Sequence, residues 1–244
     1  MAIKNRIKLS IIIISSAFLL GFINFKQGYK NIITYMNDYQ VVLTKEAVFD
    51  RIFVNTDFAK LEYMEGNNVF HFISPFTCYM LAIFWGSFSY LLLKKNYHPF
   101  IYSRINTKQE ALKKLRGPYV QNVVLFVGVY VATIFLFIYL NDVLVYQDML
   151  KFIKRIIFLT ISSILISIGL SSLMFYVYLK WNEIIALLVI FISILCLFIV
   201  DLNWKTISIV FIGDDTYFVG GIITGFVLIF LSHLLLKNVK YEIE

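Results

Sequence analysis

Residues 94–117, KKNYHPFIYSRINTKQEALKKLRG, form the most strongly basic stretch of the chain. They include seven Lys or Arg residues and one acid, Glu110. Apolar runs long enough to cross a bilayer flank the stretch on both sides. Short loops rich in Lys and Arg stay in the cytoplasm. The stretch is therefore expected to be a cytoplasmic loop that sets the orientation of the other apolar runs.

The same stretch predicts a short helix with recognisable ends. Thr107 is followed three residues later by Glu110, the spacing of a capping box. In that motif each side chain accepts a hydrogen bond from the other residue's backbone N–H. Gly117-Pro118 has the composition of a helix stop. We therefore expect a helix of about nine residues between these signals.

This expected helix is amphipathic. Ala111, Leu112 and Leu115 fall on one face, and basic side chains surround the rest. A lone helix of about nine residues is marginal in water, so a neighbour must support it. One interpretation places it on anionic lipid headgroups. In the other, it docks into a second protein and transmits movement.

The composition is that of a polytopic membrane protein. Hydrophobic residues make up 60% and aromatic residues 18% of the 244, and the mean hydropathy is +0.79. The basic residues behind the net charge of +7 mostly flank apolar runs, so nucleic acid is not an expected partner. Cys78 and Cys196 both fall inside apolar runs, which favours packing roles over a disulfide.

The hydropathy pattern predicts an all-α membrane fold with six transmembrane helices in a single domain, residues 1–244. Basic residues near both termini place the N- and C-termini in the cytoplasm. No small-residue cleavage site follows the first apolar run, so it is interpreted as a span and not as a signal peptide. Frequent Ile, Lys and Asn suggest an AT-rich bacterial genome, and the expected location is the bacterial plasma membrane. The expected spans cover about residues 9–25, 72–93, 119–140, 152–179, 184–200 and 218–236, with an outer segment at 26–70 and the cytoplasmic loop at 94–118.

Two outer segments have distinctive patterns. Residues 26–70 carry six acids and five bases, a near balance that fits an outer location. Helical spacing within this segment predicts an amphipathic helix on the outer membrane face. Its apolar positions are Leu43, Ala47, Val48 and Ile52. Ile207 to Ile212 is apolar but far too short to cross, so it is either a packed outer connection or a re-entrant piece.

A basic cluster, Lys151, Lys154 and Arg155, lies at the outer end of the fourth expected span, against the positive-inside tendency. Long basic side chains can extend to a membrane interface. Alternatively, the cluster attracts an anionic or amphipathic substrate. Both interpretations are open at this stage.

Small residues at regular intervals predict close helix packing within the membrane. Such residues let two helices approach closely, although the pattern is common in apolar sequence. The expected packing positions are Ser163, Ser167, Ser171, Gly221 and Gly225.

The sequence lacks the patterns expected of an enzyme or a metal site. It contains no H-E-x-x-H, C-x-x-C or G-x-S-x-G pattern, and no G-x-x-x-x-G-K-[ST] loop for ATP. Its three histidines lie near three different span ends, so no metal site is expected. No charged residue falls in the middle of an expected span, which argues against an ion-coupled transporter.

The pattern as a whole resembles the membrane subunit of the ABC-2 type of ATP-binding-cassette exporters. The shared features are six spans, cytoplasmic termini, a cytoplasmic helix between spans two and three, and an apolar outer connection between spans five and six. Tyr102 to Leu115, YSRINTKQEALKKL, looks like the loop of that family that carries the coupling helix. The motif covers about fifteen residues, whereas the architecture covers the whole chain.

The resemblance implies a coupling helix that docks onto a separate cytoplasmic ATPase subunit, which would hold ATP and Mg²⁺. It also implies a second permease subunit, identical or a sister chain, and contact with membrane lipids. The best-matched substrate is an amphipathic or antimicrobial peptide, with lipid, polysaccharide precursor and drug left open. The implied docking residues are Arg104, Thr107, Glu110, Ala111, Leu112 and Leu115.

Two other functions are kept open. A stand-alone immunity or sensor protein would bind a peptide without an ATPase. The outer segment 26–70 and the basic cluster at Lys151 motivate this alternative. A membrane enzyme acting on lipid has no supporting constellation in the sequence.

Overall fold

The structure is a computed structural model that describes residues 2–53, 73–104, 108–204, 206–210 and 217–238. Within the helical parts, the side chains of residues 2–6, 89–115, 202 and 238 lie outside the description. The described residues form seven helices and no strand. These helices are α1 (Ala2–Tyr39), α2 (Lys45–Phe53), α4 (Ile73–Arg104), α5 (Lys108–Tyr139), α6 (Met149–Lys180), α7 (Glu183–Asn203) and α8 (Val219–Asn238).

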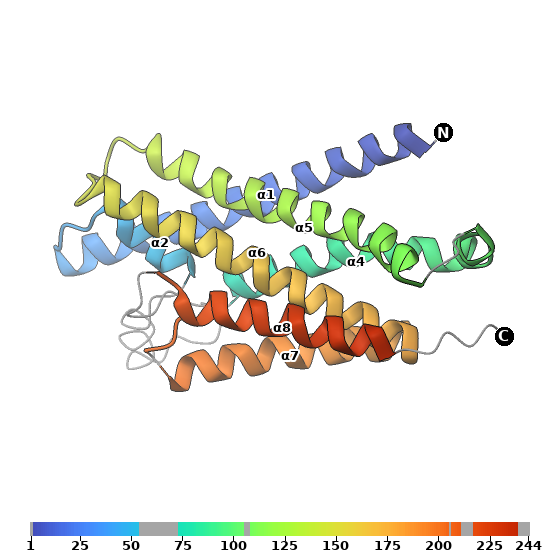
Figure 1. Cartoon of the computed structure of the whole chain (residues 1–244). Coiled ribbons are helices and arrows are strands. Elements are labelled where there is room, and N and C mark those ends of the chain that lie inside the picture. The colour runs from blue at the N-terminus through green and yellow to red at the C-terminus, as the bar shows by residue number, and fades with distance from the viewer. Residues whose placement is uncertain (1, 54–72, 105–107, 205, 211–216, 239–244) are drawn as a thin grey trace.

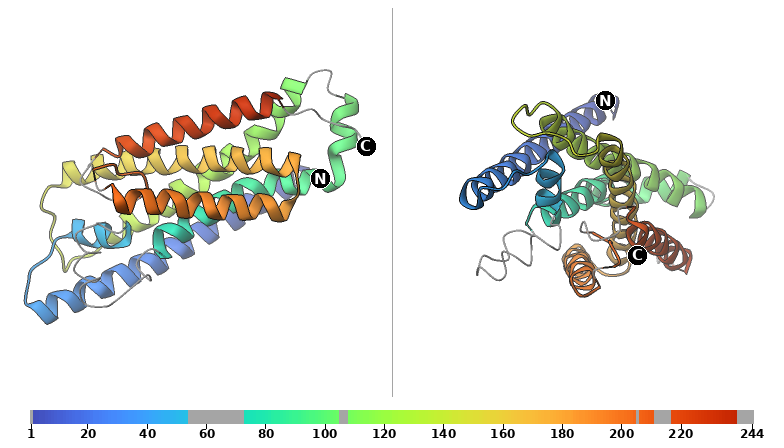
Figure 2. Two further views of the ribbon diagram at one scale, coloured as in Figure 1. Left: turned by 90° about the horizontal axis from the view of Figure 1, so that it is seen from below. Right: turned by 90° about the vertical axis from the view of Figure 1, so that its left-hand side faces the viewer.

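The six long helices form an elongated bundle in which α6 is central (Figure 1). Helices α1 and α5 pack together on one side of α6, and α7 and α8 lie on the other side (Figure 2). The N-terminus, the end of α8 and the α4–α5 and α6–α7 connections lie at one end of the bundle. Helix α2 and the α5–α6 connection lie at the opposite end, which we call the α2 end.

Helix length and hydropathy identify a multi-pass membrane protein. Five helices, α1, α5, α6, α7 and α8, are long and apolar enough to cross a bilayer. In α4 the apolar part among the described residues is Ile73–Phe88, which is shorter than a span. Of the six expected spans, five therefore have this support within the described part of the chain.

Helix α1 is longer than the sequence analysis predicts. The apolar run ends at Phe25, but the helix continues to Tyr39 and so extends into the first third of the expected outer segment 26–70. The continuation is helical because one face of it packs on α2. Ile32 is buried there, and a Cβ added to Gly28 would lie 2.6 Å from Cγ1 of Ile52. Lys26 and Lys30 remain exposed on the other face.

Helix α2 confirms the amphipathic helix expected in the outer segment. Ala47, Val48 and Ile52 are buried against α1 and α5, as their spacing predicts. Leu43 precedes the helix and is half-buried against the same core.

The expected helix stop at Gly117-Pro118 is wrong. Helix α5 begins at Lys108, next to Thr107, which is outside the described residues, and runs through Pro118 to Tyr139. Proline removes one helical hydrogen bond and costs about 3 kcal/mol in a helix interior. The burial of Tyr119, Val123 and Phe126 immediately after the proline stabilises the helix and offsets this cost.

Helices α6 and α8 form the most extensive helix pair. Glycines allow the close approach: a Cβ added to Gly225 would meet Cβ of Leu165 at 2.6 Å, and one added to Gly169 would meet Cβ of Leu228 at 2.6 Å. One added to Gly221 would meet the Ser162 hydroxyl.

The connection between α7 and α8 is packed within the described residues. Ser208, Ile209 and Val210 are buried. The Asp201 carboxylate accepts the backbone N–H groups of Ile209 and Val210 at 2.9 and 2.8 Å. This geometry favours the packed connection of the two alternatives for Ile207 to Ile212, whose last two residues lie outside the description.

Candidate functional site

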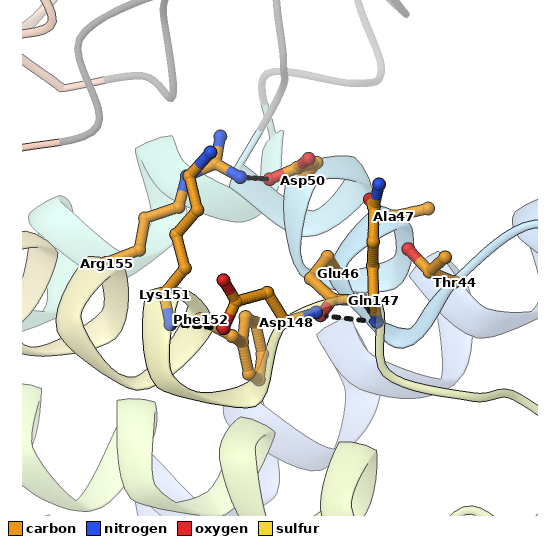
Figure 3. A pocket seen from close by; sticks show the side chains of 9 residues that line it. All are labelled: Thr44, Glu46, Ala47, Asp50, Gln147, Asp148, Lys151, Phe152 and Arg155. Carbon is orange, nitrogen blue, oxygen red and sulfur yellow. Dashed lines mark hydrogen bonds and ion pairs between the residues drawn. The ribbon is translucent and has the colours of Figure 1, made fainter.

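A polar pocket of about 480 Å³ opens at the α2 end of the bundle (Figure 3). It lies between α2, the α5–α6 connection and the first turns of α6. Its volume falls in the range of small-molecule sites. The lining residues are Thr44, Glu46, Ala47, Asp50, Gln147, Asp148, Lys151, Phe152 and Arg155.

The α2 wall of the pocket is fixed to the α5–α6 connection by Glu46. Its Oε1 accepts the backbone N–H groups of Gln147 and Asp148 at 3.0 and 3.2 Å. The preceding residue adds two further contacts, because the backbone N–H of Lys45 donates to the Val145 carbonyl at 3.1 Å and its Nζ donates to the Tyr139 carbonyl at 3.0 Å. The start of α2 is therefore fixed to the connection by both main-chain and side-chain hydrogen bonds.

An ion pair crosses the pocket from α2 to α6. Nη1 of Arg155 lies 2.9 Å from Oδ1 of Asp50, and the two side chains are only 15% and 13% exposed. Figure 3 shows Lys151 and Arg155 on the α6 wall, facing Asp50 on α2. Charge-assisted pairs of this kind are stronger than exposed ones because water screens them less.

The sequence between α5 and α6 favours a capped start of α6. Asp148 is the N-cap, and its Oδ1 accepts the backbone N–H of Lys151 at 3.1 Å. A carboxylate at this position satisfies an N–H group that has no partner within the helix. The carboxylate also borders the pocket.

Aromatic side chains pack beneath the pocket. The rings of Phe49 and Phe152 meet edge to face at 5.4 Å, and both residues are buried. The Lys45 ammonium lies 4.6 Å from the centre of the Tyr146 ring. Burial raises the pKa of Tyr146, and the negative charge of Glu46 raises it further.

The expected packing serines lie away from this pocket, inside the bundle. Ser163, Ser167 and Ser171 are all buried. The Ser163 hydroxyl is 3.0 Å from that of Tyr79 on α4. One residue beyond Ser171, the Ser172 hydroxyl is 2.8 Å from that of Tyr119 on α5. These hydroxyls join three helices within the membrane-spanning part of the bundle.

The expected docking residues lie at the opposite end from the pocket. Arg104 is the last residue of α4, and Glu110, Ala111, Leu112 and Leu115 fall in the first two turns of α5. Their side chains, and Thr107 entirely, are outside the described residues. Two other side chains from this end are in contact: Nη1 of Arg116 lies 3.1 Å from Nδ1 of His233 on α8.

Sequence reasoning missed Glu46 and Asp50 as partners of the basic cluster. The available signal is spacing: Glu46 and Asp50 are four residues apart on α2, as Lys151 and Arg155 are on α6. Residues at that spacing share one helix face. Nothing in the sequence shows that these two faces oppose each other.

No group of His, Cys, Asp and Glu side chains suited to a metal ion occurs among the described residues. No protein-family model, curated protein or solved structure matches the chain. What is established is a multi-pass helical membrane protein with a polar pocket at one end of its bundle.

Proposed function

We propose that the chain is the membrane-spanning permease subunit of an ATP-driven exporter of the ABC-2 type. One observation carries the proposal: α4 and α5 meet at the more basic end of the bundle (Figure 1), and α5 runs unbroken from Lys108 through Pro118 into its apolar part. Each of the two helices has 32 residues, or about 48 Å at 1.5 Å per residue. The hydrocarbon core of a bilayer is only about 30 Å thick.

The charge of the two ends supports the orientation. Among the described residues, the helix ends and connections at the α4–α5 end carry 12 Lys or Arg and 2 Asp or Glu residues. The described helix ends and connections at the α2 end carry 7 Lys or Arg and 6 Asp or Glu residues. The positive-inside tendency favours a cytoplasmic position for the α4–α5 end, where an ATPase subunit can reach it.

The continuity of α5 supplies a route for movement. The polar stretch Lys108 to Leu115, KQEALKKL, precedes the apolar part of α5 on the same helix. A displacement of these first turns by an ATPase would reach the membrane part without an intervening loop. The Tyr119–Ser172 contact would carry it to α6, and the Arg116–His233 contact to α8.

In this account ATP and Mg²⁺ bind the ATPase subunit, and a second permease, identical or a sister chain, completes the export path. The proposed substrate is an amphipathic or antimicrobial peptide. The support for this class is the polar pocket at the α2 end, beside an apolar bundle surface. A polar pocket next to an apolar surface suits a ligand that has both polar and apolar groups.

Co-purification from the native membrane tests the proposal. Leu112→Asp adds one negative charge on the apolar face of the first turns of α5. Lys113→Gln causes the same change in net charge on the opposite face and serves as the matched control. We expect wild type and Lys113→Gln to retain a stoichiometric ATPase and Leu112→Asp to lose it. A wild-type preparation that holds no ATPase yet protects cells from a peptide would instead support the stand-alone immunity function.

A further inference from the structure

The basic cluster at the start of α6 is divided between two surroundings. Lys151 and Arg155 line the pocket, and Arg155 pairs with Asp50. Lys154 does not line the pocket and is exposed. Within the described part of the chain, the ammonium groups of Lys151 and Lys154 have neither a hydrogen bond nor an ion pair. Of the three cations, Arg155 is therefore paired with a carboxylate, and Lys151 and Lys154 remain available to bind an anionic ligand.

Lys154 lies at the edge of an apolar stripe on α6. Leu150, Ile157 and Ile161 form this stripe and are 74%, 50% and 42% exposed. Successive helical residues are rotated by about 100°, so Lys154 is about 40° from Leu150 and about 60° from Lys151. In a membrane Ile157 and Ile161, on the inner side of Lys154, face acyl chains. Lys154 thus stands at the boundary between the acyl chains and the polar pocket.

The length of α6 places Lys154 at the depth of lipid headgroups. Lys180 ends the helix at the α4–α5 end, 26 residues after Lys154, which corresponds to about 39 Å. A bilayer is about 30 Å thick across its hydrocarbon core and about 40–45 Å with its headgroups. With Lys180 among the headgroups of one leaflet, Lys154 reaches the phosphates of the other.

We propose that the start of α6 binds an anionic phospholipid. Its phosphate contacts the ammonium groups of Lys151 and Lys154, whose Cβ atoms are about 5–6 Å apart at this spacing. Its acyl chains lie along Ile157 and Ile161, and its headgroup enters the pocket. Headgroup hydroxyls donate to the carboxylate oxygens of Asp148 and Glu46, which border the same space.

The two neighbouring ammonium groups favour an anionic phosphate. Each carboxylate in the lining already has a partner: Glu46 and Asp148 accept backbone N–H groups, and Asp50 pairs with Arg155. The N–H donors leave Glu46 and Asp148 charged, so the attraction for an anionic headgroup rests on the ammonium groups of Lys151 and Lys154, which have no ion-pair partner among the described residues. The apolar stripe beside them favours a lipid over free phosphate. This site does not depend on the proposed ATPase.

The test measures lipid retention by the purified full-length chain in mild detergent. Native mass spectrometry after addition of phosphatidylglycerol reports the bound lipid per chain. The test variant is Lys151→Gln/Lys154→Gln. The matched control is Lys26→Gln/Lys30→Gln, which removes two exposed lysines one turn apart at the same end of the bundle. Lys154→Gln alone provides a second, milder variant.

We expect the test variant to bind phosphatidylglycerol about 30-fold more weakly than wild type, since each of the two basic residues contributes about 1 kcal/mol to anionic-lipid attraction. The control should stay close to wild type, and Lys154→Gln should fall between them. An equal loss of affinity for phosphatidylglycerol in the control, or no loss in the test variant, would contradict the proposed site. Equal retention of phosphatidylcholine would overturn its anionic selectivity, and displacement by inorganic phosphate alone would overturn the lipid assignment.

Discussion

Arg155 on α6 and Asp50 on α2 are joined by an ion pair of 2.9 Å across the pocket at the α2 end. The pair connects the central helix of the bundle to a nine-residue helix that could not be stable alone. Helix α2 is therefore held by its surroundings: by this pair, by the Glu46 contacts and by its buried face on α1 and α5.

Asp50→Asn tests the importance of this pair. The variant leaves a largely buried guanidinium without its counter-ion, and we expect the free energy of unfolding to fall by about 1–3 kcal/mol. Titration with SDS in mixed micelles measures it. Arg155→Gln should cost a similar amount, and the double variant should cost less than the sum. Strictly additive losses would show that the two side chains do not interact.

Gly225→Ala tests the close packing of α6 and α8. An added methyl group would lie within about 3 Å of the Leu165 and Ile166 backbone, so the helices must separate. We expect a loss of about 1–3 kcal/mol.

Gly128→Ala is the control for this packing prediction. Nothing lies within 4 Å of the position of its added Cβ, and alanine favours a helix over glycine by about 0.5–1 kcal/mol. The control should therefore be neutral or slightly stabilising. Equal effects of the two substitutions would contradict the structure of the α6–α8 interface.

Asp201→Asn tests the packed connection between α7 and α8. The two carboxylate oxygens accept one N–H group each, whereas an asparagine offers one oxygen and presents an NH₂ group to the other donor. The expected loss of stability is about 1–3 kcal/mol. Asp142→Asn, at an exposed position in the α5–α6 connection, is the matched control and should have little effect.

Pro118→Ala tests the continuity of α5. In an unbroken helix the substitution restores a backbone N–H and removes a steric clash, so it should stabilise the protein by up to about 3 kcal/mol. Thermal unfolding in detergent measures the direction of the change. An unchanged or lowered midpoint would indicate that the helix ends at Gly117, as its local sequence predicts.

Local sequence patterns predicted the apolar helices well, because membrane spans are set mainly by length and hydropathy. Helices α6, α7 and α8 begin and end within three residues of the expected boundaries. The patterns failed where tertiary packing overrides them. The buried Tyr119 and its neighbours maintain α5 through Pro118, and α2 supports α1 well beyond Phe25.

The pocket was less predictable than the helices. The basic residues Lys151 and Arg155 stood out because they oppose the positive-inside tendency. Their counterparts Glu46 and Asp50 lie about a hundred residues earlier, in a segment of balanced charge. Pairing between such distant segments depends on the packing of α2 against α5 and α6, and no local pattern records that packing.

The account stands on the α4–α5 end of the bundle facing the cytoplasm, because only there can an ATPase subunit reach α5. The most direct measurement labels single cysteines in intact cells with a membrane-impermeant maleimide, after Cys78 and Cys196 are replaced by alanine. The account predicts that Asp142→Cys is labelled in intact cells and that Gln109→Cys is labelled only after permeabilisation. Labelling of Gln109→Cys in intact cells would contradict the orientation and, with it, the proposed coupling to an ATPase.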